Sequence, residues 1–554
     1  MFDHTKYRPF PAIQRPHRQW PNQTITAAPQ WCAVDLRDGN QALMEPMNVI
    51  QKQKIWKLLV EMGFKHIEVG FPSASQTDFD FVRWLIEEDQ IPEDVTIQVL
   101  VQARDHLIER TYESLIGAKQ AIVHVYNSTS PVQRDKVFKM EKSGIIDIAK
   151  AGAEKVATEA AKYPNTQWTF QYSPESFSST EIDFAIEVCN AVIDVWKPTE
   201  NNKAIINLPA TVECAGPNVF ADQVETFCEH INRREAIIVS VHTHNDRGCA
   251  VAAAELAVMA GADRVEGTLM GNGERTGNMD IITMAMNLYS QGVDPKIDMS
   301  DAFKITKTVE ECTRIPTHAR HPWMGELVYT AFSGSHQDAI KKCLSIQDED
   351  QPWDVAYLPI NPEDIGRDYQ SVIRVNSQSG KGGVAYMIER QFGIEMPRWM
   401  QIEVSQAVQA YTEQNECEVD AETIWSIFTE QFIHEQDTTR LTSFETQFEQ
   451  GCEKIEANIL IDQTIHHITG EGHGVIEAFC EGLSTLQGKR IEIKQFEQTS
   501  MGRDRGAKAL SMMHIQIDNE KHVSVAMHED SVQSSINCIL GALNQYQSNQ
   551  KQAA

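Results

Sequence analysis

The sequence predicts an α/β protein built around a (β/α)8 TIM barrel, followed by helical linker subdomains and a C-terminal α+β domain. Three observations support this prediction. The chain has 554 residues, more than one hydrophobic core usually holds. From residue 31 to about 290, short apolar runs alternate with longer helical patterns, which is typical of a parallel sheet. There are eight such runs, the number that closes this barrel.

Each predicted strand is a short apolar run bounded by polar or glycine-containing segments. In chain order the runs are WCAVD (31–35), HIEVGF (66–71), TIQVLV (96–101), AIVHVY (121–126), WTFQY (168–172), AIINL (204–208), IIVSVH (237–242) and RVEGTL (264–269). Between them, apolar residues three and four positions apart predict helices at 48–62, 76–88, 134–162, 180–196 and 250–260. An open, doubly wound sheet is the alternative, and it is disfavoured because no dinucleotide fingerprint follows the first strand.

The remaining segments differ in pattern from the barrel. Residues 1–30 contain several prolines and are expected to form an N-terminal arm, and residues 31–325 hold the barrel. Residues 326–445 mix loop-rich stretches with helices, which predicts linker subdomains. In residues 446–554 the order strand, strand, helix, three strands, helix predicts a separate α+β domain.

Composition narrows the class of protein. The formal net charge is −29 and the pI is about 5.0, so we expect no nucleic-acid partner, because such binding needs a basic patch. Eleven cysteines without a C-x-x-C pair indicate reduced thiols. No apolar run approaches the roughly 20 residues that cross a bilayer, and the N-terminus has no signal-peptide core. We therefore expect a cytoplasmic protein with no membrane partner.

Polar residues follow the first, seventh and eighth predicted strands, at the end of the barrel where catalytic residues gather. Strand alternation lets His242 and His244 point at one place, and Asp38 could add a carboxylate. Two imidazoles and a carboxylate suit a divalent metal such as Zn, Mn, Mg or Fe. An H-x-H pair alone is more often two hydrogen-bonded histidines, and the strand-end position favours the metal site.

Two other motifs have simpler explanations when taken singly. The RDG of residues 37–39 could be an ordinary turn with a solvated Arg–Asp pair. GNGERTGN (271–278) could be only a flexible loop, since it matches neither a dinucleotide nor a P-loop fingerprint. Its glycines would nevertheless let backbone N–H groups approach an anion near the last strands.

Taken together, LRDGNQ, HTHNDRG and GNGERTGN resemble the acyl-CoA carboxylate condensing enzymes related to hydroxymethylglutaryl-CoA lyase. Within that group, VHVYNSTS, YSPESFSSTE, NLPATVE and FSGSHQDAI resemble the longer form of the 2-isopropylmalate synthase family. The resemblance covers nearly the whole chain, including RVNSQSGKGGVAY in the linker. It implies a Claisen-type condensation of acetyl-CoA with 2-oxoisovalerate (3-methyl-2-oxobutanoate) and thioester hydrolysis. The resemblance implies that the products are 2-isopropylmalate and CoA, in the first committed step of leucine biosynthesis.

The resemblance also assigns site residues. It implies a divalent metal, Mg²⁺ first with Mn²⁺ or Zn²⁺ as alternatives, held by Asp38, His242, His244 and Asn278. It implies catalytic roles for Arg37, Glu175, His336 and Tyr369, with His336 as base and Tyr369 assisting it. The keto acid would contact His124, Ser173, Glu175 and Thr211, and CoA would contact Gly271 and Gly273. Without the resemblance, His124 is a core histidine, Thr211 a strand-end hydroxyl and His336 a residue near a helix start.

The C-terminal domain resembles the family's leucine-binding regulatory domain. The resemblance implies leucine as feedback effector, at glycine-rich loops that include Gly470, Gly472, Gly474 and Gly502. His473 and the charged residues 503–505 are bulkier than the family's usual residues there. A homodimer is also implied, with the linker reaching the partner's barrel, and activation by K⁺ is left open.

Other functions can be built on the same barrel. A carbon–carbon lyase is disfavoured by the C-terminal domain and by GSHQD, and a homocitrate- or citramalate-type synthase by HVYNSTS and NLPATVE. An amino-acid sensor that has lost catalysis is the third alternative. It is disfavoured because Arg37, Asp38, His242, His244 and Asn278 are all present.

Overall fold

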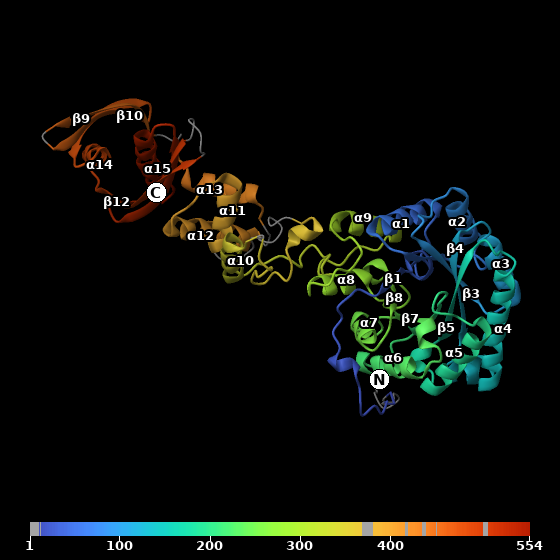
Figure 1. The fold of residues 1–554 in the computed structure, drawn as a ribbon. Helices are drawn as coiled ribbons and strands as arrows, with labels where there is room; N and C mark the ends of the chain where they lie inside the picture. The colour runs from blue at the N-terminus through green and yellow to red at the C-terminus, as the bar shows by residue number, and fades with distance from the viewer. Residues whose placement is uncertain are drawn as a thin grey trace. The chain divides into compact units, whose positions relative to one another are not determined.

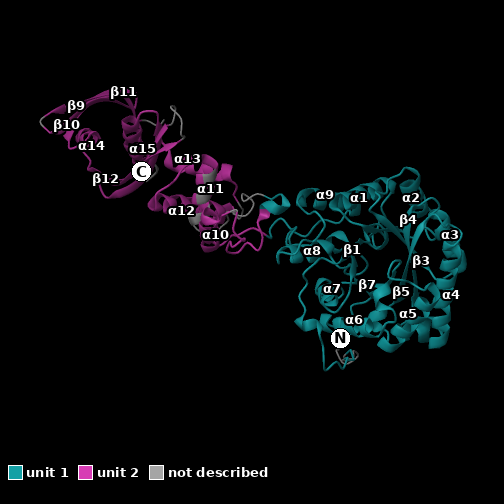
Figure 2. Cartoon of the chain, in the orientation of Figure 1, with its two compact units in different colours: residues 1–328, 363–367 teal, residues 329–362, 368–554 magenta. Residues whose placement is uncertain are grey.

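A computed structural model describes residues 10–11, 13–348, 350–367, 381–415, 419–434, 439–449, 451–501 and 508–553. The chain divides into two units, the first made of residues 1–328 and 363–367 and the second of residues 329–362 and 368–554 (Figure 2). Among the described residues, no helix has the length and apolar character needed to span a membrane. The ten cysteines that the structure describes are all free thiols.

Eight parallel strands close into a barrel in the first unit (Figure 1). They are β1 (Gln30–Ala33), β2 (His66–Gly70), β3 (Thr96–Gln102), β4 (Gln120–Ser128), β5 (Gln167–Glu175), β6 (Ala204–Ala210), β7 (Ile237–Thr243) and β8 (Arg264–Gly267). Each strand pairs with the next, and β8 pairs with β1 in parallel register. The predicted barrel is therefore confirmed, and the open sheet is excluded.

Helices surround the barrel and alternate with its strands (Figure 1). They are α1 (Val49–Met62), α2 (Gln76–Glu87), α3 (Asp105–Ser114), α4 (Lys142–Ala160), α5 (Ile182–Trp196), α6 (Pro217–His230), α7 (Ala250–Met259), α8 (Ile281–Tyr289) and α9 (Ala302–Thr313). Local sequence explains their ends: Asn48 and Gln51 form a capping box before α1, and Gly63 ends it in the left-handed conformation.

One predicted helix, 134–162, is divided in the structure. A π-helical turn over Gln133–Phe138 precedes α4, and Lys139 between them has a φ of 53°. The break follows from tertiary contacts, because the buried guanidinium of Arg134 donates to the carbonyl oxygen of Thr129 and to the carboxylate of Glu181. Periodicity alone could not reveal these contacts.

The N-terminal arm is fastened to α6 by charged groups. Arg18 donates to the carboxylate of Asp222 at 2.6 and 2.8 Å, and the indole N–H of Trp20 donates to it at 3.0 Å. Arg15 lies 2.8 Å from the carboxylate of Glu225. Both carboxylates are buried, so the arm supplies the partners that a buried charge requires.

The second unit begins with helices and ends with two antiparallel sheets. The helices are α10 (Gly334–Ile346), α11 (Lys381–Phe392), α12 (Arg398–Asn415) and α13 (Ala421–Phe432). The sheets contain β9 (Thr439–Glu449), β10 (Cys452–Ile461) and β11 (Thr464–Gly472), and then β12 (Ile491–Met501), β13 (Lys508–Ile517) and β14 (Glu520–His528). Helices α14 (Val475–Gln487) and α15 (Ser531–Ala553) pack on the sheets. The predicted α+β domain is confirmed.

Strand β9 was not predicted, and the boundary expected between residues 445 and 446 falls inside it. Its apolar residues Leu441, Phe444 and Phe448 are three and four positions apart, which is a helical spacing. The pairing of β9 with β10 shifts by one residue at Thr442, which forms a bulge. Because the bulge changes the alternation, Leu441 and Phe444 both reach the hydrophobic core.

Candidate functional site

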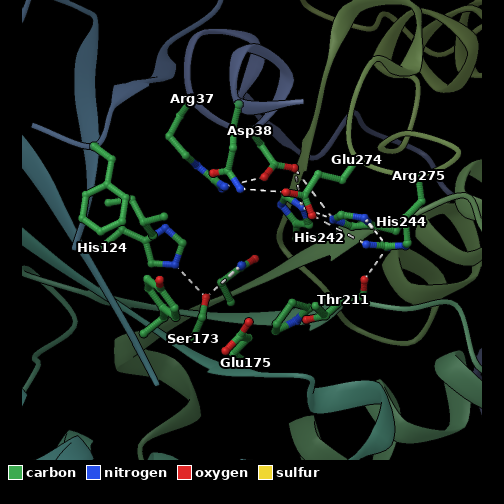
Figure 3. Close-up of a pocket in the computed structure, with 16 residues that line it drawn as sticks. Arg37, Asp38, His124, Ser173, Glu175, Thr211, His242, His244, Glu274 and Arg275 are labelled. Carbon is green, nitrogen blue, oxygen red and sulfur yellow. Dashed lines mark hydrogen bonds and ion pairs between the residues drawn. The ribbon is translucent and has the colours of Figure 1, made fainter. Parts of the chain in front are cut away.

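A cavity of about 170 Å³ opens at the carboxyl ends of the barrel strands (Figure 3). Each strand, or the loop directly after it, supplies at least one lining residue. These are Arg37, Asp38, Gln41, Phe71, Leu100, His124, Tyr126, Ser173, Glu175, Asn207, Pro209, Thr211, His242, His244, Glu274 and Arg275. The structure thus brings together residues that the sequence places up to 238 positions apart (275 − 37).

A single π-helical turn after β1, Asp35–Gly39, directs Arg37 and Asp38 toward the cavity. The carbonyl oxygen of Val34 accepts hydrogen bonds from three consecutive N–H groups of this turn at 2.9–3.2 Å. The buried carboxylate of Asp35 accepts an N–H from the loop after β8 at 2.9 Å. The turn is therefore fixed both to its own strand and to a neighbouring loop.

Asp38, His242 and His244 converge on one point, with ligand atoms that all lie within 4.8 Å of one another. The two Nε2 atoms are 3.1 Å apart, and Oδ2 of Asp38 lies 3.5 and 3.8 Å from them. Atoms bonded at about 2.1 Å to one metal, at tetrahedral or octahedral angles, are separated by about 3.0–3.4 Å. The three residues therefore form a candidate metal site that needs little adjustment.

The hydrogen bonding of these residues also fits a cation ligand site. Oδ2 of Asp38 and Oδ1 of Asn278 are buried and accept no hydrogen bond from the protein. Asn278 pairs with His244 in an isolated antiparallel bridge, and its Nδ2 donates to the carbonyl oxygen of Asn272. Since buried acceptors are usually satisfied, the unsatisfied Oδ2 of Asp38 next to the two imidazoles matches the donor set of a divalent metal.

Charged neighbours keep Arg37 and Asp38 ionised inside the barrel. Burial opposes the charge of each group. Arg37 donates to the carboxylates of both Asp38 and Glu68, and these charges raise the pKa of Arg37 above its ordinary value. In turn, Arg37 and the histidines hold the pKa of Asp38 well below its usual range. The cavity thus contains a fixed cation beside an anionic ligand group.

The two histidines are perturbed in opposite directions. Burial disfavours the charge of His242, but the neighbouring carboxylates of Asp38 and Glu266 outweigh it and raise the pKa of His242 to about 9. Burial and the positive charge of His242 lower the pKa of His244 to about 3. Arg275 also donates to Nδ1 of His244 at 2.7 Å. A divalent cation would take the place of the proton on His242.

Of the residues predicted to contact the keto acid, His124, Ser173 and Glu175 lie away from the two histidines, whereas Thr211 lies beside His244 and Arg275 (Figure 3). Nε2 of His124 is 2.7 Å from Oγ of Ser173, and Nδ1 of the same ring is 2.9 Å from the carboxylate of Glu68. Glu175 accepts a hydrogen bond from Ser128, and the hydroxyl of Thr211 accepts the N–H of residue 176. The alternative reading of His124 as a core histidine is incomplete, since it is buried and also lines the cavity.

Gly271 and Gly273 lie in the loop that carries Asn278, where they have a packing role. A Cβ on Gly273 would lie 2.3 Å from Nδ2 of Asn278, so a larger residue would displace that amide. Gly271 has a φ of 71° and accepts the N–H of Asn278 at 3.0 Å. These glycines let the loop fold back on itself and place Asn278 beside His244.

The other predicted residues lie in the second unit or outside the described residues. His336 is the third residue of α10, and its ring stacks on Tyr357 with centroids 3.9 Å apart. Gly470 and Gly472 lie in β11, where α14 packs closely, and a Cβ on Gly470 would be 1.9 Å from the carbonyl oxygen of Ala478. Gly474 precedes α14. Tyr369 and Gly502 lie outside the described residues.

Several residues of the cavity were not predicted from the sequence. Leu100, Tyr126, Asn207 and Pro209 line it from β3, β4 and β6, and Arg275 lines it from the loop after β8. Strand alternation could have indicated two of them, because Tyr126 is two positions from His124 and Pro209 two from Thr211. A second signal was an acidic residue inside the apolar runs HIEVGF and RVEGTL, which marks Glu68 and Glu266.

Three family models match successive parts of the chain. HMGL-like matches residues 28–309, the barrel. Alpha-isopropylmalate synthase, post-catalytic domain-like, matches residues 326–389, and the LeuA allosteric (dimerisation) domain matches residues 418–547. The order of the matches follows the barrel, the linker helices and the antiparallel sheets.

Curated relatives match over the full length. A 2-isopropylmalate synthase of Alcanivorax borkumensis is 52% identical over 554 residues, covering 100% of this chain and 99% of the relative. One of Pseudomonas syringae pv. syringae is 53% identical over 540 residues, covering 97% and 96%. Among solved structures, the HMG-CoA lyase of Brucella melitensis covers 52% of this chain and 100% of its own, with 14% identity and a TM-score of 0.42. The chain belongs to the 2-isopropylmalate synthase family.

Proposed function

We propose that this protein condenses acetyl-CoA with 2-oxoisovalerate and hydrolyses the thioester, releasing 2-isopropylmalate and CoA in leucine biosynthesis. The full-length identity of 52% to a 2-isopropylmalate synthase supports the reaction. The single structural observation that carries the proposal is the convergence of Asp38, His242 and His244 within 4.8 Å at the mouth of the barrel.

We assign the metal to Asp38, His242, His244 and Asn278. A bound divalent metal supplies Lewis-acid polarisation of the keto group. The four side chains hold and orient it, and the unsatisfied oxygens of Asp38 and Asn278 support their assignment. Mg²⁺ is the first metal to test, with Mn²⁺ and Zn²⁺ beside it, because two imidazole ligands also suit the softer ions.

Arg37 stabilises the oxyanion that develops in the condensation. Its guanidinium lines the cavity next to Asp38, and its hydrogen bond to Glu68 fixes its direction. The guanidinium is always positively charged and is already oriented toward the cavity. It therefore does not have to move or change its protonation when negative charge develops on the substrate. This makes Arg37 the electrostatic partner of the reacting carbonyl.

The keto acid occupies the side of the cavity formed by His124, Ser173, Glu175 and Thr211. These residues line the cavity, and they offer both donors and acceptors to a carboxylate and a carbonyl. We also assign Glu175 a catalytic role, and its carboxylate accepts a hydrogen bond from Ser128. Acetyl-CoA approaches along the loop that contains Gly271 and Gly273.

His336 removes the proton from the acetyl methyl group, with Tyr369 assisting it. His336 belongs to the second unit, so the proposal requires a linker that reaches a barrel, and we assign it to the partner subunit of a homodimer. The match to a dimerisation domain over residues 418–547 supports the homodimer.

Leucine is the proposed feedback effector, bound in the C-terminal domain near Gly470, Gly472, Gly474 and Gly502. The name of the matched domain, LeuA allosteric, supports regulation through this part of the chain. We further propose a cytoplasmic location, and K⁺ as an activator to be tested alongside the divalent metals.

Thiol release from acetyl-CoA tests the proposed reaction directly. The purified protein is assayed with a colorimetric thiol reagent across a panel of 2-oxo acids, with and without EDTA, and the acid product is identified by mass spectrometry. We expect 2-oxoisovalerate to give the highest kcat/KM, with loss of activity in EDTA. A higher kcat/KM for pyruvate or 2-oxoglutarate would contradict the assignment, and leucine added at millimolar concentration tests the inhibition.

A further inference from the structure

Beneath the cavity lies a layer of polar side chains that are completely buried. Glu68, Gln98, Gln171, Arg264 and Glu266 all have an exposed fraction of 0%. They come from β2, β3, β5 and β8, so they meet inside the barrel. Burying charged groups costs several kcal/mol each unless close partners compensate, so this layer requires a specific reason.

Glu266 links this layer to the candidate metal site. Its Oε2 lies 3.0 Å from Nδ1 of His242, and its Oε1 accepts hydrogen bonds from Arg264 and Gln171, each at 2.7 Å. Both oxygens are therefore engaged. With Nδ1 of His242 held from below, Nε2 of the same ring faces Asp38.

Arg264 in turn restricts the carboxylate of Glu266. Its Nη1 also donates to Oγ of Ser240 at 2.9 Å, and its Nη2 donates to Oε1 of Gln98 at 2.7 Å. The Nε–H donates to Nδ1 of His66 at 3.1 Å. A guanidinium with bonds on all three nitrogens cannot rotate freely, so Glu266 is fixed as well.

The other buried glutamate serves the opposite half of the site. Glu68 accepts hydrogen bonds from Arg37 and from Gln98, and its Oε2 lies 2.9 Å from Nδ1 of His124. It is as buried as Glu266 and carries the same charge. Two of its partners, Arg37 and His124, belong to the proposed oxyanion and keto-acid positions, whereas Gln98 also donates to Glu266 at 3.3 Å. The two glutamates form a matched pair with different targets.

We propose that Glu266 is a positioning residue that holds His242 with Nε2 directed at the metal, and that Arg264 keeps Glu266 in place. This inference rests on the proposed function, because it requires a metal at Asp38 and His242. A carboxylate on the distal nitrogen of a metal-binding histidine fixes the orientation of the ring and its tautomer. Loss of such a partner typically weakens metal affinity by about 10- to 100-fold.

The experiment compares Glu266→Gln with Glu68→Gln in the full-length protein after metal removal. Co²⁺ is titrated into each variant and followed by its visible d–d absorption. We expect Glu266→Gln to raise the Kd for Co²⁺ by about 10- to 100-fold and to shift the d–d bands. We expect Glu68→Gln to keep the Kd within about threefold of wild type while kcat or the KM for the keto acid changes.

Two outcomes would overturn the inference. Equal weakening of Co²⁺ binding in both variants would mean that metal affinity depends on the buried negative charge and not on the contact with His242. An unchanged Kd in Glu266→Gln would mean that the contact between Glu266 and His242 does not affect metal affinity. If circular dichroism shows that Glu266→Gln does not fold, Glu266→Asp keeps the charge but shortens the side chain. A folded Glu266→Asp with wild-type Kd and d–d spectrum would also overturn the inference.

The same titration separates this inference from the proposed function. Failure of the wild type to bind Co²⁺, or equal binding by His242→Ala, would contradict the metal site itself. Tight binding by the wild type, weak binding by His242→Ala and wild-type binding by Glu266→Gln would overturn only the role of Glu266.

Discussion

The interior of the barrel and the core of the C-terminal domain are both fully buried, but they differ in chemistry. Under the cavity, the barrel contains Glu68, Gln98, Arg264 and Glu266, each bonded to other polar groups. The C-terminal core contains apolar side chains instead, including Phe479, Ile515, Ile539 and Leu543. Alternate residues of β13 pack into two different apolar cores, one on each face of its sheet.

The difference indicates where each part gains its stability and its function. Apolar burial contributes directly to folding, at roughly 25 cal/mol per Å². A buried ion network contributes little net stability, because desolvation offsets its attractions. Its benefit is orientation of the groups above it. Substitutions in the barrel interior should therefore affect catalysis and metal binding most. Substitutions in the C-terminal core should affect the free energy of unfolding most.

The largest expected effect comes from removing a metal ligand. His242→Ala should lower kcat/KM by about 10⁴-fold or more, because the polarising metal contributes several kcal/mol to the transition state. Thermal unfolding is measured alongside, and a lower Tm is expected, because the substitution leaves Oε2 of the buried Glu266 without its partner. Activity within tenfold of wild type, after chelation and metal readdition, would contradict the assigned role.

The next effect tests the apolar side of the comparison. Phe479 has an exposed fraction of 0%, and Phe479→Ala should lower the free energy of unfolding of the C-terminal part by about 3–5 kcal/mol. Denaturant unfolding followed by circular dichroism measures this change. Phe448→Ala is the matched control, because Phe448 is 67% exposed. Equal destabilisation by both substitutions would contradict the burial of Phe479 in the core of the C-terminal domain.

Arg37→Lys should reduce kcat by about 100-fold while leaving the Kd for Co²⁺ near its wild-type value. Lysine keeps the charge but cannot contact Asp38 and Glu68 with a planar fork. Steady-state kinetics and the metal titration separate the two effects. A large loss of metal affinity together with unchanged kcat would assign Arg37 to the metal site instead of the oxyanion.

The smallest effect concerns pH and the turn that carries Arg37. Burial raises the pKa of Asp35 to about 7, although a backbone hydrogen bond opposes this. The protonated acid is favoured in the folded state, so stability should fall as pH rises from about 4 through 7. Asp35→Asn removes this dependence. Its free energy of unfolding should exceed that of wild type by about 1 kcal/mol or more at pH 8, and the difference should shrink at pH 5.

Thermal unfolding of wild type and Asp35→Asn across this pH range provides the measurement. Asp94→Asn is a suitable control, because Asp94 is exposed and its pKa is lowered by Lys65. Parallel pH profiles for wild type and Asp35→Asn would mean that Asp35 does not titrate in this range.

Much of this structure could be predicted from sequence because its signals are local. All eight barrel strands follow from short apolar runs, and Asp38, His242 and His244 follow from their positions at strand ends. Asn278 is proposed as a ligand only because of the family resemblance, since a neutral amide in a glycine-rich loop is typical of a turn. Its location beside His244 depends on the close packing of the loop at Gly273.

The features that sequence analysis missed depend on contacts between distant segments. Nothing near Glu266 in the sequence indicates that its carboxylate meets His242 on the neighbouring strand. The bulge at Thr442 interrupts the alternation of inward and outward residues in β9. The apolar residues of this strand therefore have the spacing of a helix. The proposed role of His336 as a base depends on residues far from it in the chain, and neither its motif nor its stacking on Tyr357 identifies them.

The most direct test of the account is an activity titration with metal. Protein stripped with EDTA and dialysed is supplied with increasing Mn²⁺, while bound metal and thiol release with 2-oxoisovalerate are measured at each step. We predict that activity rises in proportion to bound metal and reaches its maximum at one equivalent per chain, and that His242→Ala neither binds that equivalent nor gains activity. Full activity in the stripped protein, or activity unrelated to bound metal, would contradict the account.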